Sequence, residues 1–162
     1  MILTVTGHRP NKLYGYDLNN PKYKKLYNKI YDVLVREKPS HCISGMALGV
    51  DTIFACAVLN YKKENPDVIL ECAIPCRNHS SRWNKKDTEL YNRILKLADK
   101  VTLVTHEAYK PYLMEVRNRY MIDKANKILA IWNGDENGGT YNAVKYSKKK
   151  DKEMIYIDPS EI

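Results

Sequence analysis

Glycine, arginine and short polar residues are concentrated in four segments of the chain, each of which follows an apolar run. The segments span residues 6–10, 44–51, 75–83 and 133–140, and they hold six of the seven glycines. Glycine between a strand and a helix leaves backbone N–H groups free at the positive end of the helix, where phosphate or another anion can bind. Tight turns favour the same residue types without any ligand. Because four such junctions would converge on one edge of a sheet, we favour a ligand site.

The most specific segment is Ser-Gly-Met-Ala-Leu-Gly-Val-Asp at residues 44–51. Gly45 and Gly49 allow a tight turn out of a strand and a close approach of another backbone. The pattern is neither G-x-G-x-x-G nor a P-loop, so it indicates neither a standard dinucleotide fingerprint nor a Walker site. Asp51 either stabilises the start of a helix through the helix dipole or accepts hydrogen bonds from a ribose or a base edge.

The triplet Arg117-Asn118-Arg119 is a second group of candidate ligand-binding residues. Guanidinium groups present paired donors that suit phosphate or carboxylate. Asp123 lies four residues after Arg119, so a surface ion pair is the alternative interpretation of that arginine. A structural ion pair is the alternative for Arg117. For a bound base, we expect Trp83 or a tyrosine to provide the stacking surface.

Other chemistries have less support in the sequence. The series Cys72-x-x-x-Cys76-x-x-His79 lacks a fourth zinc ligand and the usual C-x-x-C pairs, so we expect no metal and interpret the thiols as buried structural groups. Ser44 is not surrounded by the G-x-S-x-G pattern of a nucleophilic serine. His8 titrates in the range of a general base near neutral pH, but a loop histidine that only forms hydrogen bonds is the more common outcome.

The elements that must position these residues alternate between two periodicities. Short β-like runs occur at residues 2–6, 41–44, 68–74, 101–105, 127–132 and 154–157. Helical spacing is clearest over residues 23–35, and we expect further helices at residues 48–64, 85–97, 112–125 and 139–149. This alternation predicts an α/β fold: a single Rossmann-like, doubly wound domain over residues 1–162, with a mostly parallel sheet of about six strands and helices on both faces. Ligands bind such sheets beyond the carboxyl ends of the strands.

Composition excludes several classes of protein. Of the 162 residues, 44% are hydrophobic and 28% are charged, as in ordinary globular domains. No apolar run approaches the roughly 20 residues of a membrane helix, and the N-terminus lacks the basic region of a signal peptide. We therefore expect no membrane association. The four cysteines lack the spacing of a secreted disulfide framework, which favours a reducing, cytoplasmic setting. The net charge of +8 comes largely from lysines on predicted helix faces, which predicts only weak, non-specific binding of nucleic acid.

In their order along the chain, these motifs resemble those of the YpsA-like proteins of the SLOG superfamily. These are Rossmann-like domains related to the DNA-processing protein DprA and to the LOG cytokinin-activating enzymes. The resemblance extends from about residue 2 to residue 157 and implies a pocket for a nucleotide or a nucleotide-derived ligand at the strand ends. The residues that match the family's loops are Gly7, His8, Arg9, Ser44, Gly45, Gly49, Asp51, Arg117, Asn118, Arg119, Gly138, Gly139 and Thr140. Met46, Asn133 and Trp83 complete the set that we expect to contact the ligand.

The resemblance does not extend to the catalytic glutamate of the LOG enzymes. Their Pro-Gly-Gly-x-Gly-Thr-x-x-Glu motif corresponds here to Gly138-Gly139-Thr140 followed by Tyr-Asn-Ala, with no carboxylate at the matching place.

The leading hypothesis is a binding module that senses or sequesters a nucleotide or an ADP-ribose-like ligand and needs no cofactor. The first alternative is a hydrolase that cleaves the N-glycosidic bond of a nucleotide, for which His8, Asp51 and Glu115 are the catalytic candidates. The second alternative is a DprA-like DNA-binding protein. We also expect a homo-oligomer.

Overall fold

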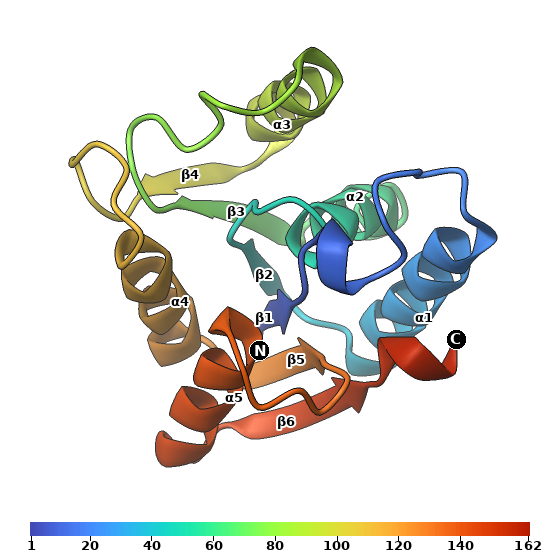
Figure 1. Ribbon diagram of the computed structural model, residues 1–162. Helices are drawn as coiled ribbons and strands as arrows, with labels where there is room; N and C mark the ends of the chain where they lie inside the picture. The colour runs from blue at the N-terminus through green and yellow to red at the C-terminus, as the bar shows by residue number, and fades with distance from the viewer.

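The computed structural model describes residues 1–162. Its centre is a sheet of six parallel strands in the order β4-β3-β2-β1-β5-β6 (Figure 1). The strands are β1 (Ile2–Gly7), β2 (His41–Ser44), β3 (Ile69–Ile74), β4 (Lys100–Leu103), β5 (Lys127–Ile131) and β6 (Glu153–Ile157). The central strands β1, β2 and β5 are almost continuously buried, as expected where helices cover both faces of a parallel sheet.

Five α-helices form the two outer layers: α1 (Pro21–Glu37), α2 (Val50–Tyr61), α3 (Lys85–Leu97), α4 (Leu113–Lys124) and α5 (Gly139–Lys149). The first three pack in series over one face of the sheet, and α4 and α5 pack together over the other (Figure 1). Two short 3-10 helices, η1 (Pro10–Lys12) and η2 (Pro159–Glu161), follow β1 and β6. No helix combines the length and apolar character needed to cross a membrane.

Alternation along the strands explains this layering. On β3, Leu70, Cys72 and Ile74 belong to the main core beneath α1, α2 and α3. Ala73, on the opposite side of the strand, packs with Met121 of α4. Cys72 is therefore a buried core thiol, as its spacing predicted.

The predicted fold is confirmed in its strands, its helices and the coverage of both faces. The boundaries differ by a few residues, most clearly at α2, which begins at Val50 and ends at Tyr61 where the periodicity suggested residues 48–64. The start is late because Gly49 has φ +93°, which is outside the helical region. The short strand β4 begins one residue earlier than predicted and ends at Leu103.

The strand order places a topological switch point between β1 and β5. The chain builds β1, β2, β3 and β4 outward in one direction and then returns to add β5 on the other side of β1. The loops after β1 and β5 therefore leave the sheet toward opposite layers, and a crevice opens between them at the carboxyl edge.

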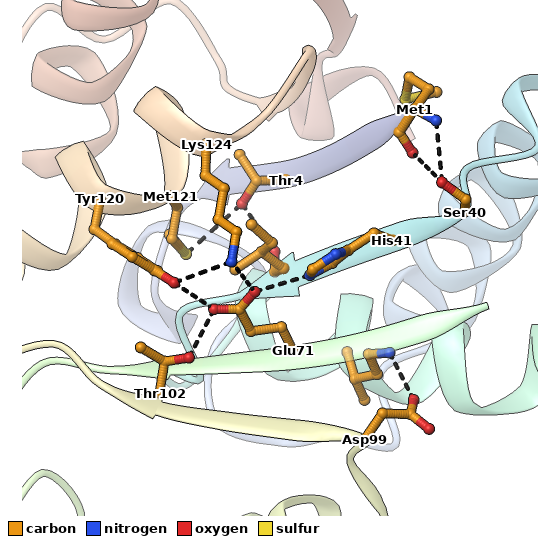
Figure 2. A network of polar contacts seen from close by, with 12 residues as sticks. Met1, Thr4, Ser40, His41, Glu71, Asp99, Thr102, Tyr120, Met121 and Lys124 are labelled. Atoms are coloured by element: carbon orange, nitrogen blue, oxygen red, sulfur yellow. Dashed lines mark hydrogen bonds and ion pairs between the residues drawn. The ribbon is translucent and has the colours of Figure 1, made fainter.

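A buried carboxylate, Glu71 on β3, fastens α4 to the sheet (Figure 2). Its Oε1 accepts hydrogen bonds from His41 Nε2 at 2.8 Å and Lys124 Nζ at 3.0 Å. Its Oε2 accepts from Thr102 Oγ1 at 2.8 Å and Tyr120 Oη at 2.6 Å. Burial opposes ionisation of this carboxyl group, but the four hydrogen bonds outweigh burial and lower its pKa to about 2. Two of these donors lie on α4, so the network determines where that helix sits.

Candidate functional site

A cavity of about 250 Å³ lies at the switch point, at the carboxyl ends of β1 and β5. Its walls come from the β1–α1 loop, the start of α2, the first turns of α4 and the start of α5. Eight of the residues that the sequence singled out line it together: Gly7, His8, Arg9, Asp51, Arg117, Asn118, Gly139 and Thr140. Three of the four segments expected to converge thus meet at one edge of the sheet, whereas residues 75–83 do not line the cavity.

Two glycines hold the β1 loop against the start of α2. A Cβ atom on Gly7 would lie 2.5 Å from the Val50 side chain, and one on Gly49 would lie 2.5 Å from the His8 carbonyl oxygen. The Val50 amide donates to that same carbonyl at 3.2 Å. Gly49 also has a positive φ, which favours glycine. Where the first two loops meet, they pack closely because glycine has no side chain. A larger residue at Gly7 or Gly49 would push the two loops apart.

The β2–α2 loop supports the cavity from below. Ser44 Oγ accepts from the Met46 amide at 3.2 Å and donates to the Asp51 carbonyl at 2.8 Å. These bonds hold Met46 at φ 60°, an unusual conformation for a residue with a side chain, and the Met46 side chain is fully buried in the core. Ser44 and Met46 thus fix the conformation of the β2–α2 loop from its buried side, and neither residue lines the cavity.

Asp51 and Arg117 are buried and converge on Gly45. A Cβ atom at Gly45 would lie 2.8 Å from both Arg117 Cζ and Asp51 Oδ2, so only glycine leaves room for the two side chains. Arg117 Nη1 donates to the Gly45 carbonyl, and Asp51 Oδ2 accepts from the Ala47 amide at 3.3 Å. Burial raises the pKa of Asp51, and the Arg117 charge opposes that effect. Asp51 is the one carboxylate in the cavity lining.

His8 is buried at the cavity wall and is held on both ring nitrogens. Its Nε2 accepts from the Asn133 amide at 3.4 Å, and its Nδ1 lies 3.5 Å from Thr140 Oγ1. Burial, followed by the positive charge of Lys12, lowers the pKa of His8. A neutral imidazole with both nitrogens occupied links the loops after β1 and β5. Asn133 therefore contacts His8 and does not itself line the cavity.

The cavity carries a net positive charge next to an uncapped helix. Arg9, Lys12 and Arg117 against Asp51 give a formal charge of 3 − 1 = +2. The helix α5 begins after Gly138, which provides no side-chain cap, and its first turn contains no acidic residue. Its free N–H groups and positive dipole end therefore face a cationic cavity whose lining contains one carboxylate, Asp51, while Asp135 pairs with Lys12 from outside the lining.

Residues that the sequence analysis did not name individually also line the site. They are Val5, Thr6, Asn11, Lys12, Ala47, Met114 and Asn137. Lys12 Nζ lies 3.2 Å from Asp135 Oδ2 and donates to the Asn137 carbonyl at 3.4 Å, so it bridges the loops after β1 and β5. Asn11 and Lys12 directly follow the Thr-Gly-His-Arg-Pro motif, and extending that motif by two residues would have found them.

Two further expected residues, Trp83 and Arg119, lie away from the cavity. Trp83 packs edge-on against His79 and Tyr91, with ring centroids 5.0 and 5.1 Å away, and contacts the main core. Arg119 pairs with Glu115 at 2.9 Å on the exposed side of α4. The sequence offered Asp123 as the partner of Arg119, whereas the structure pairs that carboxylate with the Tyr146 hydroxyl.

Comparison with known proteins agrees with this architecture. A family model described as the YspA SLOG family matches residues 3–162. A UPF0398 protein of Bacillus pumilus is 27% identical over 161 residues, covering 96% of this chain and 87% of that protein. The prophage-derived protein YoqJ of Bacillus subtilis is 31% identical over 147 residues, covering 82% of this chain and 85% of its own length.

Two solved structures of DNA processing protein A share the fold. The Helicobacter pylori protein, described in its single-stranded DNA binding mode, has a TM-score of 0.66 at 15% identity, and the Streptococcus pneumoniae protein has 0.66 at 16%. The matches cover 98% and 96% of this chain, which spans 65% and 50% of those two proteins. The structures share the fold, and the match of the family model to residues 3–162 establishes that the chain belongs to the YspA SLOG family.

Proposed function

We propose that this protein binds a nucleotide or a nucleotide-derived ligand, of the ADP-ribose type, with a phosphate group in the switch-point cavity. The observation that carries the proposal is the uncapped start of α5 facing Arg9, Lys12 and Arg117 across that cavity. Free helix amides and guanidinium groups are the donors that proteins use to bind phosphate.

The remaining lining residues suit the sugar that follows the phosphate. The Asp51 carboxylate can accept hydrogen bonds from ribose hydroxyl groups, and Asn118 and Asn137 add side-chain amides to the cavity lining. The volume of about 250 Å³ lies below the roughly 300–1,000 Å³ usual for drug-sized ligands. The cavity therefore suits a phosphate and its sugar, with the rest of the ligand outside it.

Calorimetric titration with inorganic phosphate, ribose 5-phosphate and ADP-ribose tests this proposal. Arg9 is exposed and lines the cavity, so we expect Arg9→Gln to fold normally and to weaken binding by about 10- to 100-fold, the usual loss for a hydrogen bond to a charged group. Arg36→Gln is the matched control, because Arg36 is an exposed arginine on α1 that pairs with Glu37. Absence of binding at millimolar ligand, or equal loss in both variants, would refute the proposal.

Single-stranded DNA is the second candidate ligand. The fold similarity to a DNA processing protein described in its single-stranded DNA binding mode favours it, as does the net charge of +8. Titration of an oligonucleotide at low and moderate salt separates the two candidates. Affinity that persists in moderate salt and is lost in Arg9→Gln would support DNA as the ligand of this cavity. Affinity that disappears with salt would indicate counterion release at dispersed lysines.

A further inference from the structure

A second pocket, of about 200 Å³, adjoins the switch-point cavity in the groove between α4 and α5. The two spaces share Met114, Asn118 and Gly139 as lining residues, so they lie directly beside each other. Together their volumes fall within the range usual for small-molecule sites. The second pocket thus extends the phosphate cavity on the side of the α5 N-terminus.

The groove offers flat surfaces suited to an aromatic ring. Tyr112, at the start of α4, leaves 54% of its surface exposed beside the pocket. Two turns further along α4, the Arg119 guanidinium lies 4.9 Å from the centroid of the Tyr146 ring on α5 and is held there by Glu115 at 2.9 Å. The Tyr146 hydroxyl in turn donates to Asp123 at 2.7 Å. Tyrosine rings and arginine planes are the groups on which proteins stack nucleobases.

The same groove also offers groups that can read the edge of a base. Asn118 Oδ1 accepts from Arg117 Nε at 2.9 Å, so its NH₂ group is the donor that this lining residue has left for a ligand. Asn142, one turn into α5, is exposed and contributes a whole side-chain amide. A side-chain amide supplies both a donor and an acceptor, as the Watson–Crick edge of a base requires.

We propose that the α4–α5 pocket receives the base of the nucleotide whose phosphate occupies the switch-point cavity. The inference rests on the proposed function and narrows it, because the ligand becomes a nucleotide recognised through its base and not a sugar phosphate alone. It also assigns stacking to Tyr112 and to the Arg119–Tyr146 pair, since Trp83 packs against the core away from the phosphate cavity. Arg119, which lies outside that cavity, thereby acquires a role in binding.

The test compares ribose 5-phosphate with AMP, GMP, CMP and UMP by calorimetry on the full chain. We expect at least one nucleotide to bind about 10- to 100-fold more tightly than ribose 5-phosphate, as stacking on an aromatic side chain provides. Tyr112→Ala is expected to remove about 10-fold from nucleotide affinity and to leave ribose 5-phosphate unchanged. Arg119→Met provides a second variant, at the Arg119–Tyr146 pair of the same pocket. Tyr109→Ala is the matched control, because Tyr109 is 53% exposed and lines neither space.

Each outcome decides between the two proposals. If ribose 5-phosphate binds but no nucleotide binds more tightly, the base pocket is refuted while the phosphate cavity stands. The same holds if Tyr112→Ala and Arg119→Met both leave the nucleotide preference intact, or if they weaken both ligands equally. If neither ribose 5-phosphate nor any nucleotide binds, the proposed function fails, and the base pocket fails with it.

Discussion

Replacing Glu71 by glutamine should destabilise the protein in a way that depends on pH. The carboxylate is fully buried, accepts four hydrogen bonds and pairs with Lys124 at 3.0 Å (Figure 2). Glutamine has nearly the same shape, so Glu71→Gln removes the charge without opening a cavity. Even if the amide finds new partners among the hydroxyl groups of Thr102 and Tyr120, Lys124 loses its carboxylate.

The magnitude follows from the pKa of Glu71. Lowering this pKa from the ordinary value of 4.5 to about 2 stabilises the folded state by about 3 kcal/mol at neutral pH. Because the folded pKa lies below the unfolded one, this stabilisation is fully present above about pH 4.5. It is lost as the pH falls from there toward 2, where the folded protein also takes up the proton.

Urea unfolding measures this effect directly when wild type and Glu71→Gln are compared at several pH values between 7 and 2.5. We expect the variant to be less stable by about 3 kcal/mol at pH 7 and the difference to shrink steadily below pH 4.5. Lys127→Met is a useful comparison, since Lys127 pairs with Glu37 and Glu153, which are not fully buried. A difference under about 1 kcal/mol at pH 7, or one that persists unchanged at pH 2.5, would refute the reasoning.

Three further predictions concern backbone, protonation and thiols. Gly49→Ala should destabilise the protein and abolish ligand binding, because the new Cβ would meet the His8 carbonyl. Gly134 has a similar positive φ but open surroundings, so Gly134→Ala should cost only the backbone strain of about 1 kcal/mol. Equal losses of unfolding free energy in urea for the two variants would contradict this. Burial, reinforced by nearby arginines, lowers the pKa of His79 to about 3, so the unfolded state takes up a proton first as the pH falls below 6.5. Below pH 6.5, the free energy of unfolding measured in urea should therefore fall less steeply with pH in His79→Asn than in wild type. The same pH dependence in both proteins would argue against this prediction. Only Cys56 of the four thiols is not fully buried, so a thiol reagent should modify one cysteine at most in the folded protein and all four after unfolding.

The sequence alone determined the order of elements and the loops that form the site. Periodicities of two and about 3.6 residues depend on local burial, which one chain segment can display by itself. Glycines at strand ends likewise mark positions where the backbone must turn or approach another chain segment, and the two closest approaches occur at Gly7 and Gly49. These features identified the edge of the sheet that carries the cavity.

The tertiary structure decided which side chains serve that cavity. Arg117 and Arg119 have the same chemistry and lie two positions apart, but on a helix they point to nearly opposite sides. One therefore lies buried beside Gly45, and the other lies exposed in the groove beside Tyr146. Trp83 was expected at the ligand and instead packs with His79 and Tyr91, because the distance between loops is not encoded in their spacing along the chain.

Glu71 illustrates the same limit within a strand. Its place in an apolar run marks a buried strand, yet nothing local identifies the four partners that keep it ionised. These partners come from β2, β4 and α4, and only the packing of those elements brings them within 3.0 Å of one carboxylate. Local periodicity thus determined the elements, while long-range packing determined the electrostatics of the carboxylate that holds α4 and its arginines in place.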